Sequence, residues 1–109
     1  IRVPADEIVQ HLPSANNHVD ADVVLLSWVE GHFGKRDRDV FEDPSAFGFS
    51  SVVLLLDGLD EASDTTRVLE WVLSWSSDCG RSVVITTRQF PADHGAKWLQ
   101  EKGYRLMKL

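Results

Sequence analysis

The sequence predicts an α/β domain whose sheet is mostly parallel and flanked by helices. Two short apolar runs, SVVLLL at 51–56 and SVVITT at 82–87, have the length and composition of buried strands. A helical pattern lies between them, and a further strand and helix precede them, which is the alternation typical of a parallel sheet. The chain has 109 residues, and its 43% hydrophobic content is enough for one small core.

The N-terminal segment is predicted to form a short strand followed by a helix. Residues 1–3 (IRV) have the composition of a strand end. Pro4 then opens a helix over 4–12, because proline suits the first helical turn and the early acids suit its positive end. Pro13 ends this helix, and the composition of SANNH at 14–18 predicts a loop.

A second helix is predicted over DADVVLLSWVEGHF, with Asp20 or Asp22 as its N-cap. Its apolar residues recur at helical spacing: Val23, Leu26, Val29 and Phe33. Gly34 is expected to end the helix. Beyond it we predict a charged, exposed connection at 35–39, and then an irregular stretch at 41–50 with a turn of helix broken at Pro44.

The second half of the chain contains the strands that define the sheet. Continuous apolar runs at 51–56 and 82–87 predict strands buried on both faces. Between them, 65–77 is predicted helical with a core-facing stripe of Val68, Trp71, Val72 and Trp75. On that stripe the two tryptophans are expected in the core rather than as a stacking platform. A short helix at 92–103 and a third strand at 104–109 complete the pattern.

Composition excludes several classes of function. The net charge of −6 disfavours a nucleic-acid partner, and no stretch approaches the roughly 20 apolar residues of a membrane span. The charge is uneven, with a balance of −10 over 1–79 and +4 over 80–109. A single cysteine, Cys79, rules out an internal disulfide and agrees with a cytoplasmic location. The four histidines lack metal-ligand spacing. A start at Ile1 without methionine suggests an internal segment.

Polar residues follow both central strands at the point where each ends. A right-handed crossover places these carboxyl ends at the same edge of the sheet, where ligands bind in open α/β folds. The predicted site comprises Asp57, Gly58, Asp60, Glu61, Thr86, Thr87 and Arg88. An aspartate at a strand end suits a magnesium ion that also contacts substrate phosphates. A carboxylate a few residues later can orient or deprotonate an attacking water.

Two further residues of this predicted site suit phosphate chemistry. Gly58 allows a sharp turn and a close approach of the backbone to a phosphate. Arg88 suits a bidentate contact with a terminal phosphate. The alternative is structural: the acids cap the helix at 65–77 and pair with Arg67 or Arg88.

VVLLLDGLDEASD at 52–64 resembles the extended Walker B motif of the NACHT-type STAND NTPases, an apolar run followed by Asp-Gly-x-Asp-Glu. RSVVITTR at 81–88 is similar to the sensor 1 strand of that family, and GYRLMKL at 103–109 to the strand that follows. The resemblance is specific over 51–88 and weaker over 1–50. It implies a partial P-loop NTPase fold, with 1–109 as a single partial NACHT-like domain, Walker B at 52–61 and sensor 1 at 83–88.

The resemblance also implies roles for single residues. Asp57 would coordinate Mg²⁺ directly or through water, and Asp60 and Glu61 would position the hydrolytic water, with the choice of catalytic acid between them left open. Arg88 would sense the γ-phosphate of ATP or GTP, its approach shaped by Thr86 and Thr87. In such proteins the nucleotide controls a switch between a closed monomer and an oligomer in defence or cell-death signalling. A non-catalytic NTPase-like scaffold or protein-interaction segment is the alternative.

One element of the family is missing from this sequence. No G-x-x-x-x-G-K-[ST] run, whose amides and lysine cradle phosphates, is present. In the family that P-loop would precede Ile1. We therefore expect the isolated chain to bind nucleotide weakly or not at all. We also expect 82–87 to leave an unpaired sheet edge, with marginal stability and self-association as the result.

Two other phosphate or metal motifs fit less well. Haloacid-dehalogenase-like phosphatases end a strand in Asp-x-Asp, whereas here the second acid follows three residues later, in Asp57-Gly58-Leu59-Asp60. In a calcium loop of the EF-hand type the acids alternate from the first position with glycine at the sixth, and Gly58 stands elsewhere.

Overall fold

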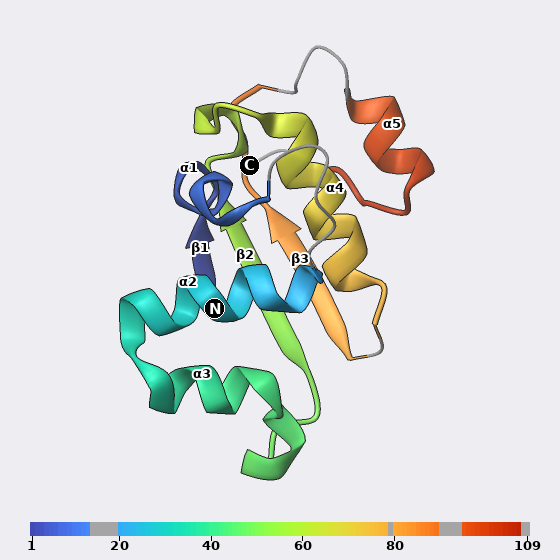
Figure 1. Ribbon diagram of the computed structural model, residues 1–109. Coiled ribbons are helices and arrows are strands. Elements are labelled where there is room, and N and C mark those ends of the chain that lie inside the picture. Colours follow the sequence, from blue (N-terminus) through green and yellow to red (C-terminus); the bar gives the residue numbers. More distant parts are fainter. Residues whose placement is uncertain (14–19, 79, 90–94, 108–109) are drawn as a thin grey trace.

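The sheet confirms the predicted α/β class. The computed structural model describes residues 1–13, 20–78, 80–89 and 95–107, so the loop predicted at 14–18 lies outside the described residues. Three strands, β1 (Arg2–Pro4), β2 (Val52–Asp57) and β3 (Arg81–Ile85), form one parallel sheet in the order β1-β2-β3 (Figure 1). Among the described residues, the only strand that pairs with β3 is β2.

Helices flank this sheet, and α2 lies across the strands in Figure 1. The α-helices are α1 (Ala5–Ile8), α2 (Ala21–Phe33), α3 (Lys35–Glu42), α4 (Thr65–Ser76) and α5 (Ala96–Glu101). Short 3₁₀ helices are η1 (Val9–His11), η2 (Pro44–Phe47) and η3 (Leu59–Glu61). The helix predicted over 4–12 is thus α1 continued by η1. No helix in the described part of the chain is both long and apolar enough to cross a membrane.

The prediction that both central strands are buried on two faces is wrong. Alternate residues of β2 point to opposite faces, and Leu54 and Leu56 are fully buried against residues of α1, α2 and α4. On the other face, Val53 is 50% exposed and Val84 of β3 is 52% exposed. The helices that form the core pack on only one face of the sheet. The continuous apolar runs of β2 and β3 therefore belong to strands that helices cover on one face only.

Helix α2 begins and ends where the sequence predicts, but its buried face differs. Asp20 is the N-cap, its carboxylate accepting a hydrogen bond from the amide of Asp22 at 2.9 Å, and Gly34 ends the helix at φ +96°. Val23 and Phe33 of the predicted stripe are more than half exposed. Leu26 and Val29 of that stripe are buried as predicted, and the buried residues of α2 are Val24, Leu25, Leu26, Trp28 and Val29.

Residues 35–39 are mostly exposed as predicted, but they belong to helix α3, so the prediction of a connection without regular structure is wrong. Gly34 turns the chain, and the amide of Arg38 donates to the Gly34 carbonyl at 3.2 Å as the helix starts. The side chain of Arg38 pairs with Glu30 of α2, with Nη1 of the arginine 3.1 Å from Oε2 of the glutamate. The charges of this segment therefore lie on a helix packed beside α2. Residues 44–47 form the predicted helical turn, η2.

Helix α4 confirms the predicted helix and its stripe. Val68, Trp71, Val72 and Trp75 are all buried, and the Trp71 indole donates to the carbonyl of Ala21 at 2.9 Å. The tryptophans are therefore core residues that tie α4 to α2. Asp64 caps the helix by accepting from the amide of Arg67.

The end of the described chain departs from the predicted third strand. Residues 92–94 of the helix predicted at 92–103 lie outside the described residues, α5 covers Ala96–Glu101, and residues 104–107 form no strand. Gly103, at φ +94°, turns the chain back, and the amide of Tyr104 bonds to the carbonyl of Leu99 at 3.0 Å. The Tyr104 side chain then packs against the core.

Candidate functional site

Residues that follow β2 and β3 meet at the carboxyl edge of the sheet. Asp57 is the last residue of β2, and Thr86 comes directly after β3. The backbone continues the pairing beyond the strands, since the amide of Leu59 donates to the Thr86 carbonyl at 2.9 Å. The Gly58 amide donates to the Thr86 hydroxyl at 3.0 Å. The predicted convergence of the two strand ends is therefore present.

Asp57 is held by two partners at this edge. Its Oδ1 accepts from the Thr86 hydroxyl at 2.5 Å. Its Oδ2 accepts from Nη2 and Nε of Arg2, at 2.5 and 3.1 Å. The Thr86 hydrogen bond, and after it the Arg2 hydrogen bond, holds the pKa of Asp57 below its ordinary value, outweighing the opposing effect of burial.

Asp60 is committed to Arg88. Its side chain is 7% exposed, and its Oδ2 lies 2.9 Å from Nε of Arg88, while the Arg88 amide donates to Oδ1 at 3.3 Å. Burial acts to raise the pKa of Asp60, but the hydrogen bonds from Arg88 outweigh it, and the net pKa is lowered. Asp60 also raises the pKa of Arg88 by the same contact. Asp60 therefore anchors Arg88 as an ion.

Glu61 and Thr87 are placed less tightly. The Glu61 carboxylate is 58% exposed, with its Oε1 3.7 Å from Nη2 of Arg88. The Thr87 hydroxyl donates to the carbonyl of Gln89 at 2.5 Å, which engages it locally rather than with the acids. Of the seven predicted residues, the structure thus brings six together and leaves Thr87 directed toward its own loop.

Gly58 occupies a turn that other residues adopt poorly. Its φ is +72°, and a Cβ at this position would lie 3.1 Å from Oε2 of Glu61. Gly58→Ala is expected to destabilise the fold by about 1–2 kcal/mol, measured by urea unfolding. As control, Gly31→Ala in α2 meets no atom within 4 Å. It should stabilise the protein by about 0.5–1 kcal/mol. Equal effects of the two substitutions would contradict this account.

The lowered pKa of Asp57 predicts an acid-dependent loss of stability. A carboxyl whose pKa is lower in the folded state stabilises the fold above its unfolded pKa, and this contribution is lost as the pH falls through the folded value. Thr86→Val should raise the pKa of Asp57 more than Arg2→Met does, because the Thr86 bond is the larger cause. Arg88→Met should instead raise that of Asp60. Carboxyl-carbon NMR titration of the three variants measures each pKa, and identical titrations would reject the assignment.

A magnesium ion held by side chains alone does not fit this edge. The described residues contain no group of three or more histidine, cysteine or acidic side chains that could hold a metal, and both oxygens of Asp57 have partners. A magnesium ion bound mainly by phosphates and water needs one or two carboxylates. Asp57 can supply one of these when Arg2 moves away, and the Arg2 side chain is 63% exposed.

Sequence reasoning missed Arg2 as a member of the site. The predicted strand at 1–3 was the available signal, but which residues of two strands pair is not readable from composition. The structure pairs Arg2 with Leu55 and Pro4 with Asp57. Since side chains of paired and diagonal positions on one sheet face are neighbours, Arg2 lies beside the Asp57 carboxylate.

Comparison of the chain with protein-family models, with curated proteins and with solved structures finds no match. The structure itself defines an α/β chain with a polar site at the carboxyl edge of a three-stranded parallel sheet.

Proposed function

We propose that these residues form the magnesium-facing and water-facing part of a nucleotide site in a NACHT-like P-loop NTPase domain. The observation that carries the proposal is the Asp57–Thr86 hydrogen bond between neighbouring strand ends, with Arg88 anchored beside it by Asp60. Ligands of open α/β sheets bind at this edge. The phosphate cradle, which this sequence does not contain, would come from a P-loop elsewhere in the protein.

Exposure and pairing suggest a division of roles between the two neighbouring acids. Asp60 is nearly buried and its two oxygens are engaged by Arg88, so it suits a positioning role. Glu61 is exposed and lies 3.7 Å from the arginine, so it suits the orientation of an attacking water. Arg88, with its side chain 80% exposed, can extend toward the terminal phosphate of ATP or GTP.

Asp57 would face the magnesium ion that accompanies the nucleotide. That ion, when bound, would neutralise charge on the phosphates. Binding of that ion by Asp57 requires Arg2 to leave the carboxylate, and an exposed ion pair of this kind is weak. The residues would act as part of a nucleotide-dependent oligomerisation switch in the cytoplasm, with nucleotide and further copies of the same protein as partners.

A non-catalytic scaffold is the second candidate, and one observation favours it. Two acids of the site, Asp57 and Asp60, already have arginine partners. Arg2 pairs with Asp57, and Arg88 pairs with Asp60. Asp64 caps α4 as well. A cluster that satisfies its own charges serves stability without any ligand.

The proposal is tested on the full coding sequence of the gene and on its purified product. The coding sequence should contain an apolar strand and a G-x-x-x-x-G-K-[ST] run on the N-terminal side of these residues, and the purified protein should hydrolyse Mg²⁺–ATP or Mg²⁺–GTP. A coding sequence without that run would reject the proposal, as would equal turnover by the wild type and a variant carrying Asp57→Asn and Glu61→Gln.

A further inference from the structure

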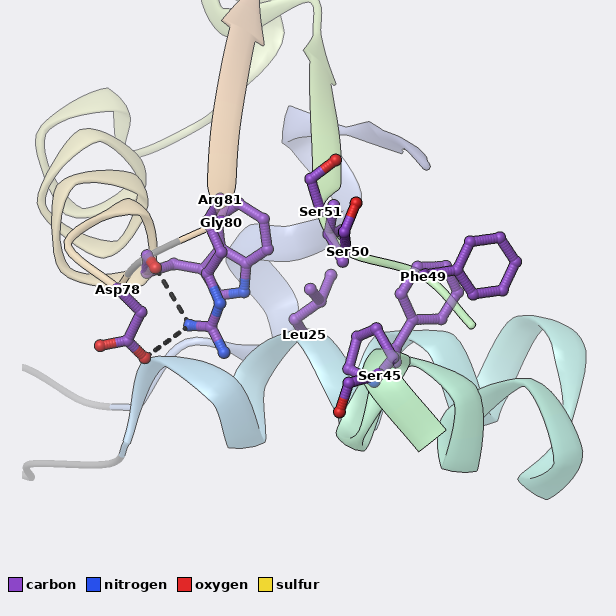
Figure 2. A pocket seen from close by; sticks show the side chains of 12 residues that line it. Leu25, Ser45, Phe49, Ser50, Ser51, Asp78, Gly80 and Arg81 are labelled. Carbon is purple, nitrogen blue, oxygen red and sulfur yellow. Dashed lines mark hydrogen bonds and ion pairs between the residues drawn. The ribbon is translucent and has the colours of Figure 1, made fainter. Parts of the chain in front are cut away.

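A groove lies at the opposite end of the strands from the acidic edge, near the amino ends of β2 and β3. Figure 2 shows part of it, a cavity of about 270 Å³ with Leu25 and Phe49 among the residues that line it. A second cavity of about 200 Å³ adjoins the first, because Leu25, Phe41, Trp75 and Arg81 line both. We call the two cavities together the amino-end groove.

The walls of the groove are about equally polar and apolar, and the apolar residues among them come from four elements. Leu25 belongs to α2, Phe41 to α3 and Trp75 to α4, while Val52 begins β2. Phe49 precedes that strand and is 56% exposed. Each cavity is smaller than the ~300–1,000 Å³ of small-molecule pockets, so it suits single apolar side chains of a larger partner.

The rim of the groove is acidic. Four carboxylates line the two cavities, those of Asp20, Asp22, Glu42 and Asp78. Among the described residues that line the cavities, the one basic residue is Arg81, and its Nη1 lies 2.6 Å from Asp22 and 3.1 Å from Asp78. The guanidinium is therefore shared between two of the four carboxylates, and four negative charges against one positive charge leave the rim with a formal charge of −3, which disfavours an anionic ligand. Charge complementarity favours a partner that brings cations on both sides of its apolar anchors.

We propose that the amino-end groove binds a basic amphipathic segment of a protein partner. One apolar side chain enters each cavity, and lysines or arginines beside these anchors face Asp78 on one side and Asp20, Asp22 and Glu42 on the other. This is the mode in which an amphipathic helix lies in a hydrophobic groove and is read by anchors at helical spacing. The site is separate from the carboxyl edge and does not depend on the proposed nucleotide function.

The 109-residue chain is tested with a synthetic 14-residue peptide of leucine and lysine whose leucines form one helical face. Isothermal titration should show binding that weakens as salt is added, because the rim charges are screened. Amide NMR shifts should concentrate at residues of the groove. A peptide with glutamate in place of lysine, and one with the leucines scrambled off a single face, should bind at least about tenfold more weakly, which is about 1.4 kcal/mol.

Matched variants identify the groove as the binding site. Phe49→Ser alters an exposed wall residue, so the fold should persist, and it is expected to weaken binding about tenfold. Glu42→Lys should weaken it similarly, whereas Asp37→Lys, an equal charge change on an exposed residue of the same helix outside the groove, should leave it unchanged.

Three outcomes would overturn the proposal. The first is no binding of the basic peptide. The second is that Asp37→Lys weakens peptide binding as much as Glu42→Lys does, which would indicate general attraction to an acidic protein. The third is a change of oligomeric state on Phe49→Ser without peptide, measured by analytical ultracentrifugation. That change would show that a second copy of the chain occupies the groove.

Discussion

Replacing Glu61 by glutamine, in a protein that joins these residues to a P-loop, is expected to lower kcat for Mg²⁺–nucleotide hydrolysis by about 10²–10⁴-fold, the usual contribution of a positioned general base. Glutamine keeps the size of the side chain and removes its basicity. Because Glu61 is 58% exposed and lies only at the edge of the Arg88 contact, the fold should be unaffected. KM should change little if the residue acts on water rather than on nucleotide binding.

Two neighbouring substitutions separate this role from structural effects. Asp60→Asn weakens the anchor of Arg88, so it should raise KM and lower the unfolding midpoint together. Thr87→Val should leave turnover unchanged, because that hydroxyl donates to the carbonyl of Gln89. If Thr87→Val and Glu61→Gln reduced kcat equally, the division of roles proposed for this edge would be wrong.

Truncating Leu56 to alanine is expected to destabilise the protein by about 2–5 kcal/mol, a large part of the stability of a small domain. Leu56 is fully buried in β2 and belongs to the core cluster beneath α1, α2 and α4. The cost combines the lost burial of the side chain with the cavity left among neighbours that relax only partly. Urea unfolding followed by circular dichroism measures the change.

Val53→Ala in the same strand is the matched control. Its side chain points to the other face of the sheet and is 50% exposed, so the loss should be less than about 1 kcal/mol. Similar losses for Leu56→Ala and Val53→Ala would mean that the chain in solution covers both faces of the sheet, for instance by self-association. The expectation of marginal stability and of association through β3 can be followed in the same samples by sedimentation.

Local patterns were sufficient for most of the secondary structure. The apolar runs that became β2 and β3, the stripe of α4 and the capped ends of α2 were all readable, because each depends on residues close together in the chain. Helix α3 was missed because its many charges resemble a loop, while its fold depends on the Gly34 turn and on contact with α2.

For the candidate site, the order of strands and polar residues was enough to predict that Asp57 and Thr86 meet. It was not enough to place Arg2, because that contact depends on strand register over a separation of 55 residues. The sequence also left the roles of Asp60 and Glu61 equivalent. The structure distinguishes them, because Asp60 is nearly buried and 2.9 Å from Arg88, whereas Glu61 is exposed and 3.7 Å from the same arginine.

Composition and periodicity therefore established the α/β class, the parallel strands and the edge at which the acids gather, since short-range propensity and the handedness of crossovers specify these features. Packing alone determined that the helices cover one face of the sheet, that the turn at Gly103 brings Tyr104 against the core, and that an acidic groove forms at the amino ends of the strands. These features depend on contacts between segments distant in sequence, and local patterns carry no information on which distant surfaces will meet.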